Sequence, residues 1–359
     1  MKDSSTGVME TYELTVGIDL GDKYSQVCVL DGEGEVIEEA RIATTQAGLK
    51  RKLSGLEPSL VVIEVGTHSR WVSALAEALG HSCLVANAYR VRRLAEGEDK
   101  SDKLDAEALA RFARSDPRLL KPIQHRGEQV ASDLAVIHSR HALVGARTKL
   151  INHVRGLVKS AGGRLPSCDA DYFHRKVAGC VPEGLRPAVE PLLEIIAEHS
   201  AKIAAYEAKI ETMIEERYAE AQHLKRQVKG VGPLISLAYV LTLEAPERFR
   251  RSRDVGPYLG LTPRQWQSGG QSRQLGISKA GNQYLRWLLI QGAHHILGPR
   301  GKDSDLRRWG LQKAQGSKNA KRRAIVAVAR KLAVLLHRLW RSGEAYQPLR
   351  GEPAGARAA

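Results

Sequence analysis

Two acidic residues near the N-terminus each interrupt an apolar, strand-like run, where a charge is costly. Asp19 lies in Thr15-Val-Gly-Ile-Asp-Leu-Gly21, and Glu64 lies in Leu60-Val-Val-Ile-Glu-Val-Gly66. A half-buried carboxylate needs a compensating partner, and a hard cation bound by several carboxylate oxygens is a common one. Asp19 and Glu64 are therefore predicted ligands for Mg²⁺ or Mn²⁺.

A second acidic pair follows in the segment Ser101-Asp-Lys-Leu-Asp105. Asp102 and Asp105 are three residues apart and precede a strong helix-forming run, so both carboxylates share one face of a helix's first turns. One interpretation is that they only complement the helix dipole, which needs no metal. Together with the two strand carboxylates, however, they favour a site for two divalent cations of the kind that supports phosphoryl transfer.

The charge of the whole chain indicates a polyanionic partner. The sequence has 55 Lys and Arg residues against 40 Asp and Glu residues, a formal net charge of +15. Nucleic acid is the polyanion that fits best, because the basic residues are spread over several predicted elements rather than confined to a tail. The glycines of Val228-Lys-Gly-Val-Gly232 resemble the turn of a helix-hairpin-helix module, which offers backbone N–H groups to a phosphate. The predicted contacts are Arg90, Arg92, Arg93, Lys229, Gly230, Gly232, Arg264, Arg273, Lys279, Asn282, Arg286, Lys318, Lys321, Arg322 and Arg323.

Cysteine usage and hydropathy predict a cytoplasmic protein. The four cysteines are widely separated and form no C-x-x-C pair, which is typical of reduced thiols. The chain opens on polar residues, and no apolar run reaches the roughly 18 residues that a membrane span requires. We therefore expect no membrane partner.

The order of predicted elements indicates an α/β domain followed by helical regions. Three strands separated by turn signals precede a β-α-β unit, whose crossover favours a parallel pair, and this is the order of a ribonuclease H-like mixed sheet. The predicted strands are 14–20, 25–30, 36–42, 60–65 and 82–86, and the predicted helices between them are 45–53 and 71–79.

Two long helices with seven-residue apolar repeats are predicted next. One spans 127–161 and the other 192–218, and their stripes predict coiled-coil-like packing on each other or on another copy of the chain. Further helices are predicted at 234–243, 285–296 and 324–340, with a loop-rich stretch of Gly, Ser and cations between the first two. We expect domains at 13–122, 127–222 and 223–345, with flexible tails at 1–12 and 346–359.

Both ends of this pattern resemble one known family. The series Asp19, Glu64, Asp102 and Asp105 resembles the RuvC-like domain of the DEDD insertion-sequence transposases. Further along, Gly230-Val-Gly232, Tyr258-Leu-Gly-Leu-Thr-Pro263, Ser268-Gly269 and Ile277-Ser-Lys-Ala-Gly-Asn-Gln-Tyr-Leu-Arg286 resemble the second, serine-bearing domain of the same family. Together these motifs cover most of residues 13–297.

The resemblance implies a serine nucleophile, and Ser268 matches its position. A serine hydroxyl can attack a DNA phosphodiester when a base or metal activates it, and Arg264, Arg273 and Lys279 could bind the phosphate. From the residues alone, a Ser-Gly-Gly turn without chemistry is the commoner case, and Ser272 and Ser278 are rivals. Ser278 could equally cap the helix that begins near Gly281.

The resemblance further implies a DNA recombinase that excises and inserts a mobile element in the bacterial cytosol or nucleoid. It implies donor and target DNA as partners, a structured non-coding (bridge) RNA as guide, and a homo-oligomer, dimer or tetramer. No standard base-reading motif is found in the sequence, and specificity supplied by base pairing would account for that. We hypothesise that the acidic and serine domains form one composite site, within one chain or across two copies.

Two other functions remain open from the sequence. One is a RuvC-like, metal-dependent DNA nuclease or junction resolvase that acts by hydrolysis and needs no serine. The other is a non-catalytic nucleic-acid scaffold, in which the carboxylates only cap helices.

Overall fold

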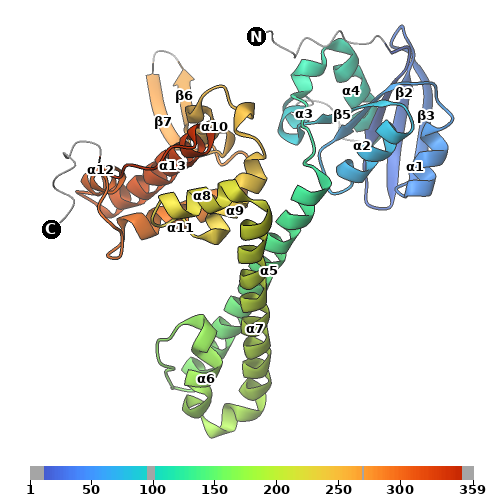
Figure 1. Cartoon of the computed structure of the whole chain (residues 1–359). Coiled ribbons are helices and arrows are strands. Elements are labelled where there is room, and N and C mark those ends of the chain that lie inside the picture. Colours follow the sequence, from blue (N-terminus) through green and yellow to red (C-terminus); the bar gives the residue numbers. More distant parts are fainter. Residues whose placement is uncertain (1–11, 95–101, 269–270, 350–359) are drawn as a thin grey trace. The chain divides into compact units, whose positions relative to one another are not determined.

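The computed structural model describes residues 12–94, 102–268 and 271–349, apart from the side chains of Tyr89, Arg92, Arg93 and residues 102–104. The chain divides into two compact units, residues 1–125 and 126–359 (Figure 1). The first predicted domain lies within the first unit and both later regions lie within the second, and the division into three domains stays a prediction.

The first unit is built on a five-stranded mixed sheet with the order β3-β2-β1-β4-β5. Strands β1, β2 and β3 are antiparallel neighbours, while β4 runs parallel to both β1 and β5. This arrangement is consistent with the predicted ribonuclease H-like sheet. The strands are β1 (Thr15–Asp19), β2 (Tyr24–Leu30), β3 (Val36–Ala43), β4 (Leu60–Glu64) and β5 (Ser82–Ala86).

Helices cover both faces of this sheet, and the alternation of side chains along each strand decides which residues meet which helix. Residues such as Ile18 and Ile63 face α1 (Gln46–Leu53) and α2 (Ser69–Ala78). The residues beside them, such as Cys28 and Val62, face α4 (Asp102–Ser115). The remaining helical segments of this unit are α3 (Ala88–Leu94) and η1 (Pro117–Leu120).

A long antiparallel helix pair begins the second unit. Helix α5 (Glu128–Ser160) and helix α7 (Arg186–Arg217) pack against each other, so the apolar stripes are used within one chain. We call this pair, with the segment that joins it, the arm. The far end of the arm has its own apolar cluster, in which Phe173 and Val177 of α6 (Phe173–Val177) pack against Ile196 of α7.

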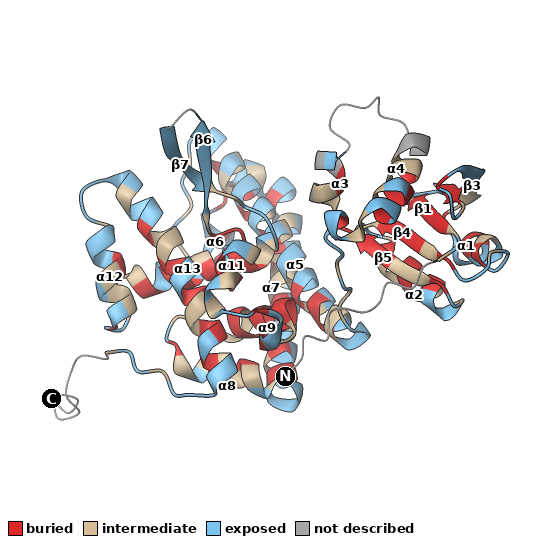
Figure 2. Cartoon of the chain, turned by 90° about the horizontal axis from the view of Figure 1, so that it is seen from above, coloured by how far each residue is buried: buried red, intermediate tan, exposed pale blue. Residues whose placement is uncertain are grey.

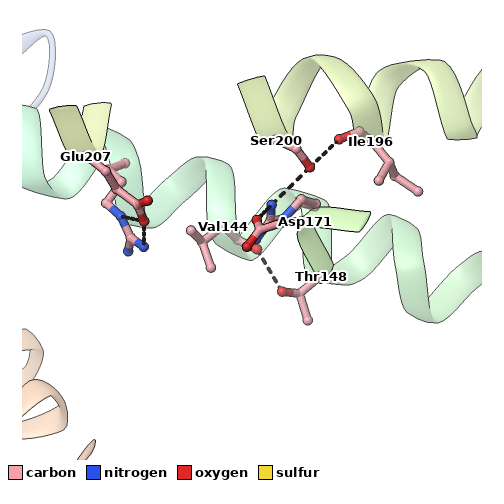
Figure 3. Close-up of polar contacts among 8 residues, drawn as sticks. Val144, Thr148, Asp171, Ile196, Ser200 and Glu207 are labelled. Carbon is pink, nitrogen blue, oxygen red and sulfur yellow. Dashed lines mark hydrogen bonds and ion pairs between the residues drawn. The ribbon is translucent and has the colours of Figure 1, made fainter. Parts of the chain in front are cut away.

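Polar contacts fix the register of the two arm helices (Figure 3). The guanidinium of Arg147, which is buried on α5, forms an ion pair with Asp171 and donates to Ser200 Oγ at 3.0 Å. Ser200 in turn donates to the carbonyl of Ile196 at 2.9 Å. Further along, Arg140 Nε donates to Glu207 Oε1 at 3.1 Å. A buried arginine with fixed partners specifies one alignment of the helices.

The rest of the second unit is a helical domain around α9. Residues Ile235 to Leu243 of α9 are all buried, and the hydroxyl of Tyr239 donates to the carbonyl of Ala333 at 2.6 Å. A two-stranded hairpin, β6 and β7, projects from this domain with nearly every residue exposed (Figure 2). The elements are α8 (Ala219–Gln227), α9 (Pro233–Leu243), η5 (Pro246–Arg248), η6 (Ser252–Asp254), α10 (Val255–Tyr258), β6 (Pro263–Ser268), β7 (Gln271–Ile277), α11 (Gln283–Leu297), α12 (Asp305–Lys313) and α13 (Lys318–Ser342).

Several elements differ from the sequence prediction. Helix α13 begins at Lys318 rather than 324, and the sequence does not predict α8 and α12. The second long helix begins at Arg186 rather than 192: Pro187 lies at its first positions, where a missing N–H is tolerated, and Pro191 lies inside the helix. The stretch predicted as a loop contains the β6–β7 hairpin. Its strands lack apolar alternation because both faces are exposed, so the usual strand pattern is missing. In the described part of the chain, no helix combines the length and apolarity needed to span a membrane.

Candidate functional site

Asp19 and Glu64 occupy equivalent positions at the same edge of the sheet. The register of the parallel pair β1–β4 matches Ile18 with Ile63, so the next residues on the two strands are Asp19 and Glu64. Neighbouring strands are about 4.8 Å apart, which brings both carboxylates within reach of one cation. Both residues are half-buried, as the sequence predicts for the end of an apolar strand. Both also take part in polar interactions with other residues.

Helix α4 covers the face of the sheet on which these carboxylates lie. Asp19 shares a face with Gly17, and Gly17 is in contact with the backbone of Ala106 and Ala110. At the other end of α4, Arg114 Nη1 donates to the carbonyl of Asp31 at 3.2 Å. Asp31 directly follows Leu30, which pairs with Thr15 at the start of β1. The C-terminal end of α4 therefore lies over the start of β1, and its first turn lies towards Asp19.

The second acidic pair lies in that first turn. The structure describes the half-buried Asp105 and places it directly before Ala106. Helix α4 begins at Asp102, but the side chain of Asp102 lies outside the described residues. The ends of β1 and β4 lie at one edge of the sheet, and the start of α4 lies towards the same edge. These three segments carry the four predicted acids.

The donor chemistry at this edge suits a hard divalent cation. Carboxylate oxygens are the ligands that Mg²⁺ prefers in proteins. The nearby thiol of Cys28 also faces α4, but burial raises its pKa to about 11, so it stays protonated and is a poor ligand. Among the described side chains, no three His, Cys, Asp or Glu residues gather as a metal-binding cluster. The described part of the edge supplies the two strand carboxylates, and the first turn of α4, which carries Asp105, lies towards Asp19.

His68 is a residue near this edge that the sequence interpretation missed. It follows β4 at the start of α2, its Nδ1 accepts a hydrogen bond from Trp71 Nε1 at 3.1 Å, and its Nε2 lies 3.9 Å from Asp22 Oδ1. Asp22 itself follows β1 and is exposed. Its position in the sequence could have identified it, because His68 comes four residues after Glu64, in the loop at the carboxyl end of the same strand.

Ser268 is the last residue of β6, at the tip of the exposed hairpin. It pairs with Gln271 across the turn, whose two glycines lie outside the described residues. Ser268 shares one face of the hairpin with Trp266 and Arg273, because Trp266 pairs with Arg273 and residues two apart point to the same side. Within the described residues, no hydrogen bond of the Ser268 hydroxyl is found. The hydroxyl therefore lies on the surface, where a substrate can reach it.

Backbone hydrogen bonds define the positions of the two alternative serines, Ser272 and Ser278. Ser272 pairs with Gln267 on the other face of the hairpin from Ser268. Ser278 does not cap the following helix; its backbone N–H donates to Thr262 at 2.9 Å, and the cap of α11 is Asn282, whose Oδ1 accepts from Leu285 N at 2.8 Å. The cap residue satisfies an orphan donor of the helix's first turn.

Most of the predicted nucleic-acid contacts are on the surface. Arg90 is half-buried on α3, where the side chains of Arg92 and Arg93 are outside the described set. The exposed residues are Lys229, Arg264, Arg273, Lys279, Lys318, Lys321, Arg322 and Arg323.

Three of the predicted contacts have roles in the fold. Asn282 is occupied in capping α11. Arg286 is buried and donates to the carbonyls of Leu259 and Ala280, at 3.0 and 2.9 Å, so it holds the loop before α11. Gly230 has a φ of 98°, and a side chain there would meet Ile296 of α11 at 3.0 Å. Glycine is thus required at this turn for packing and for its backbone conformation.

Comparison with known proteins gives the same result at both ends of the chain. Residues 16–162 match a family model of DEDD IS110 type, described as a transposase. Residues 222–306 match the model described as "Transposase IS116/IS110/IS902 family".

Full-length relatives extend this similarity. A probable family 20 transposase of Pseudomonas aeruginosa is 30% identical over 339 residues, which cover 93% of this chain and 98% of the relative. The transposase for insertion sequence element IS1111A of Coxiella burnetii is 28% identical, over 92% of this chain and 91% of its own length. The transposase for IS1328 of Yersinia enterocolitica is 28% identical, over 77% and 82% of the two chains. With two family models in order and a relative matched over nearly its whole length, the chain belongs to the IS116/IS110/IS902 family of transposases.

Proposed function

We propose that this transposase excises and inserts its mobile element by phosphoryl transfer, with the four acids of the first unit and Ser268 of the second acting on the same DNA. The observation that carries the proposal is the adjacency of Asp19 and Glu64 on parallel strands, beneath the first turn of α4. Half-buried carboxylates gathered at one sheet edge fit the two-cation arrangement of phosphoryl-transfer enzymes.

In this proposal the acids hold the cation and the serine provides the nucleophile. Asp19, Glu64, Asp102 and Asp105 would ligate Mg²⁺ or Mn²⁺, which supplies charge stabilisation for the phosphate during transfer. The Ser268 oxygen attacks phosphorus and forms a phosphoserine ester as the bond from phosphorus to one deoxyribose oxygen breaks. The serine hydroxyl gives its proton to a base, and the departing deoxyribose oxygen takes up a proton and leaves as a hydroxyl. Arg273, on the same face of the hairpin, neutralises the charge that develops on the phosphate oxygens.

Site-directed variants test the two halves separately. Asp19→Asn and Glu64→Gln should each abolish strand exchange on donor and target DNA, while Asp22→Asn, an exposed acid near the same edge, should leave it close to wild type. Ser268→Ala should abolish both exchange and any covalent protein–DNA adduct, with Ser272→Ala as matched control. Circular dichroism of each variant establishes that it is folded.

The same variants separate the proposal from the two alternatives. A hydrolytic nuclease or junction resolvase would cleave DNA at an unchanged rate with Ser268→Ala and would form no adduct. A non-catalytic scaffold would show no Mg²⁺ dependence, and Asp19→Asn would then leave DNA processing unaffected. Restoration of exchange on mixing Ser268→Ala chains with Asp19→Ala chains would mean that two copies cooperate, as a dimer or tetramer does.

We further propose that a structured RNA guides the choice of DNA. The chain carries a formal charge of +15 and no standard base-reading motif, a combination that suits a protein that holds backbones while base pairing reads sequence. Sequencing the RNA that copurifies with the protein tests this. One discrete structured species encoded beside the gene supports guidance, and random cellular RNA contradicts it.

A further inference from the structure

A groove of about 1240 Å³ lies beside the hairpin, between the base of β7, helices α12 and α13, and residues 346–348. Its floor is apolar and aliphatic, formed by residues such as Leu261, Ile277, Val326 and Val334. Six cations also line it: Lys313, Arg322, Arg323, Arg330, Lys331 and Arg338. The groove therefore combines an apolar base with a strongly basic rim.

The cations of this rim are poorly neutralised. Among the described residues that line the groove, the one carboxylate is Asp305, and one of the arginines, Arg338, forms a surface ion pair with Glu344 at 3.6 Å. Lys331 Nζ lies 3.7 Å and Lys313 Nζ lies 5.4 Å from the centre of the same Trp309 ring. Burial, and secondarily the charge of Lys313, lower the pKa of Lys331. Like charges held this close favour an anionic occupant.

The apolar floor decides which kind of polyanion fits. In a duplex the base faces are already stacked and the outer surface is polar, so an apolar floor would gain little from it. An unpaired strand has base faces, deoxyribose carbons and thymine methyl groups that an apolar surface can cover, while its phosphates reach the basic rim. This favours a single strand over a duplex.

The groove adjoins the base of the hairpin that carries Ser268. Gln274 and Leu275 of β7 both line it, close to an irregularity in the pairing of the two strands between Pro263 and Gln265. Trp266 (46% exposed) and Leu275 (45% exposed) are apolar side chains of the hairpin that are left uncovered. The hairpin and the segments on either side of it carry no acidic residue: no Asp or Glu occurs between Asp254 and Asp303 in the sequence.

We propose that this groove binds an unpaired DNA strand that runs towards Ser268 along the exposed hairpin. The strand is DNA because the groove adjoins the hairpin that carries the serine, and this choice rests on the function proposed above. Unpaired bases cover the aliphatic floor, phosphates contact the rim, and Trp266 stacks on a base next to the phosphate presented to the serine.

Binding to the full-length Ser268→Ala chain tests the rim without any covalent chemistry. The probes are fluorescently labelled oligothymidylate, a duplex and oligouridylate of the same length, with anisotropy as the readout. Arg322→Gln combined with Lys331→Gln should weaken oligothymidylate binding roughly tenfold and lower the slope of log affinity against log salt by about 1.4, since each phosphate contact on a single strand contributes about 0.7. Lys202→Gln with Lys209→Gln, which removes two exposed charges from the arm, is the matched control and should change neither quantity.

Floor variants test the preference for an unpaired strand. Val326→Ser and Val334→Ser should each weaken oligothymidylate binding about threefold to tenfold and leave duplex binding unchanged, because only the unpaired strand uses the apolar surface. Val144→Ser, at a half-buried valine on the arm, is the control. Equal losses for duplex and single strand would overturn the proposal, as would competition by polyglutamate as effective as that by oligothymidylate.

The outcomes also separate this inference from the proposed function. Binding of oligouridylate as tight as that of oligothymidylate would overturn the choice of DNA. If Asp19→Asn and Ser268→Ala abolish exchange while the groove variants bind and exchange like wild type, the groove inference alone fails. If the groove variants lose single-strand binding as expected but Ser268→Ala still forms a covalent adduct, the assignment of the serine alone fails.

Discussion

Gly17 is the residue that allows α4 to lie close over the sheet. A Cβ atom there would lie 2.0 Å from the carbonyl oxygen of Ala106 and 2.9 Å from the nitrogen of Ala110. Both are backbone atoms, so no side-chain rotation can relieve the clash, and a helix would have to move. Because the first turn of this helix carries Asp105, the absence of a side chain at Gly17 affects the proposed metal site as well as packing.

Replacing Gly17 by alanine is therefore expected to destabilise the first unit and to reduce Mg²⁺-dependent activity. Overpacking of this kind costs about 1–3 kcal/mol. Urea unfolding gives the stability, and strand exchange measured well below the unfolding midpoint gives the activity. Gly55→Ala is the control, because a Cβ at Gly55 meets its nearest atom at 3.6 Å. Equal stability of the two variants would contradict the close contact between α4 and β1.

Among the candidate site residues, the sequence pattern singles out the positions of Asp19 and Glu64, whereas the residues alone do not single out Ser268. Asp19 and Glu64 are conspicuous because a charge interrupts an apolar strand, and that pattern also fixes which edge of the sheet they share. Ser268 lies in a run of polar residues in which several serines look alike, so only the resemblance to a family selects it. Arg286 shows that a basic residue in a basic stretch need not be exposed, because it is buried and donates to two carbonyls.

At the scale of elements, apolar patterns predicted the buried helices and strands and failed where burial was absent. The central strands β1 and β4 are continuous apolar runs, so their position was clear within a residue. The hairpin β6–β7 gave no such signal, because its side chains are exposed on both faces. The stripes of α5 and α7 predicted two long helices but left open whether the partner was the same chain, which depends on the long-range contacts at the arm's end.

The apolar cluster at the far end of the arm is packed against one face of α7. Ile196 is fully buried against Phe173 and Val177, while its neighbour Ile195 is 40% exposed. Ile196→Ala should cost about 2–5 kcal/mol, since it removes buried methyl groups and leaves a cavity. Ile195→Ala, the matched control, should cost far less.

Hydrogen exchange should locate this effect. Amides of α6 are expected to lose protection in Ile196→Ala, whereas amides of the sheet in the first unit should keep theirs, since the sheet belongs to a different compact unit. Equal behaviour of the two isoleucine variants would contradict the apolar cluster at the end of the arm.

A buried histidine joins α13 to the segment before β6. His337 is fully buried; one ring nitrogen lies 3.0 Å from Ser252 Oγ and the other 3.0 Å from the carbonyl of Pro246. Burial is the main cause that lowers the pKa of His337 below its ordinary value. The unfolded chain therefore takes up a proton on this histidine at higher pH than the folded chain does. The contribution of neutral His337 to the free energy of unfolding is consequently lost as pH falls below about 6.5.

Unfolding measured between pH 7.5 and 5.5 should show this dependence. The free energy of unfolding of the wild type should fall with decreasing pH more steeply than that of His337→Gln, which cannot take up the proton. His294→Gln is the control, because His294 is exposed and its replacement should leave the slope as in wild type. Parallel slopes for wild type and His337→Gln would exclude His337 as the source.

At the scale of the whole molecule, the proposed chemistry is divided between two compact units. The acids belong to residues 1–125 and Ser268 belongs to residues 126–359. Each unit has an apolar core of its own, the first around the sheet and the second around α9. A protein divided in this way can be separated into parts that keep their own folds.

Fragments 1–125 and 126–359 are therefore each expected to unfold cooperatively. Calorimetry should detect Mg²⁺ binding to the first fragment and none to the same fragment with Asp19→Asn, while oligothymidylate should bind the second fragment alone. Neither fragment alone should exchange strands. Exchange by either one would show that the other unit is dispensable for the chemistry.

The hairpin that carries Ser268 has a consequence for when this protein can react. An isolated pair of strands is only marginally stable in water, and β6 and β7 pair only with each other in the described structure. In the proposed chemistry, the alignment of the Ser268 hydroxyl would therefore depend on the DNA strand that covers the hairpin, and the nucleophile would be held in place only once that strand is bound.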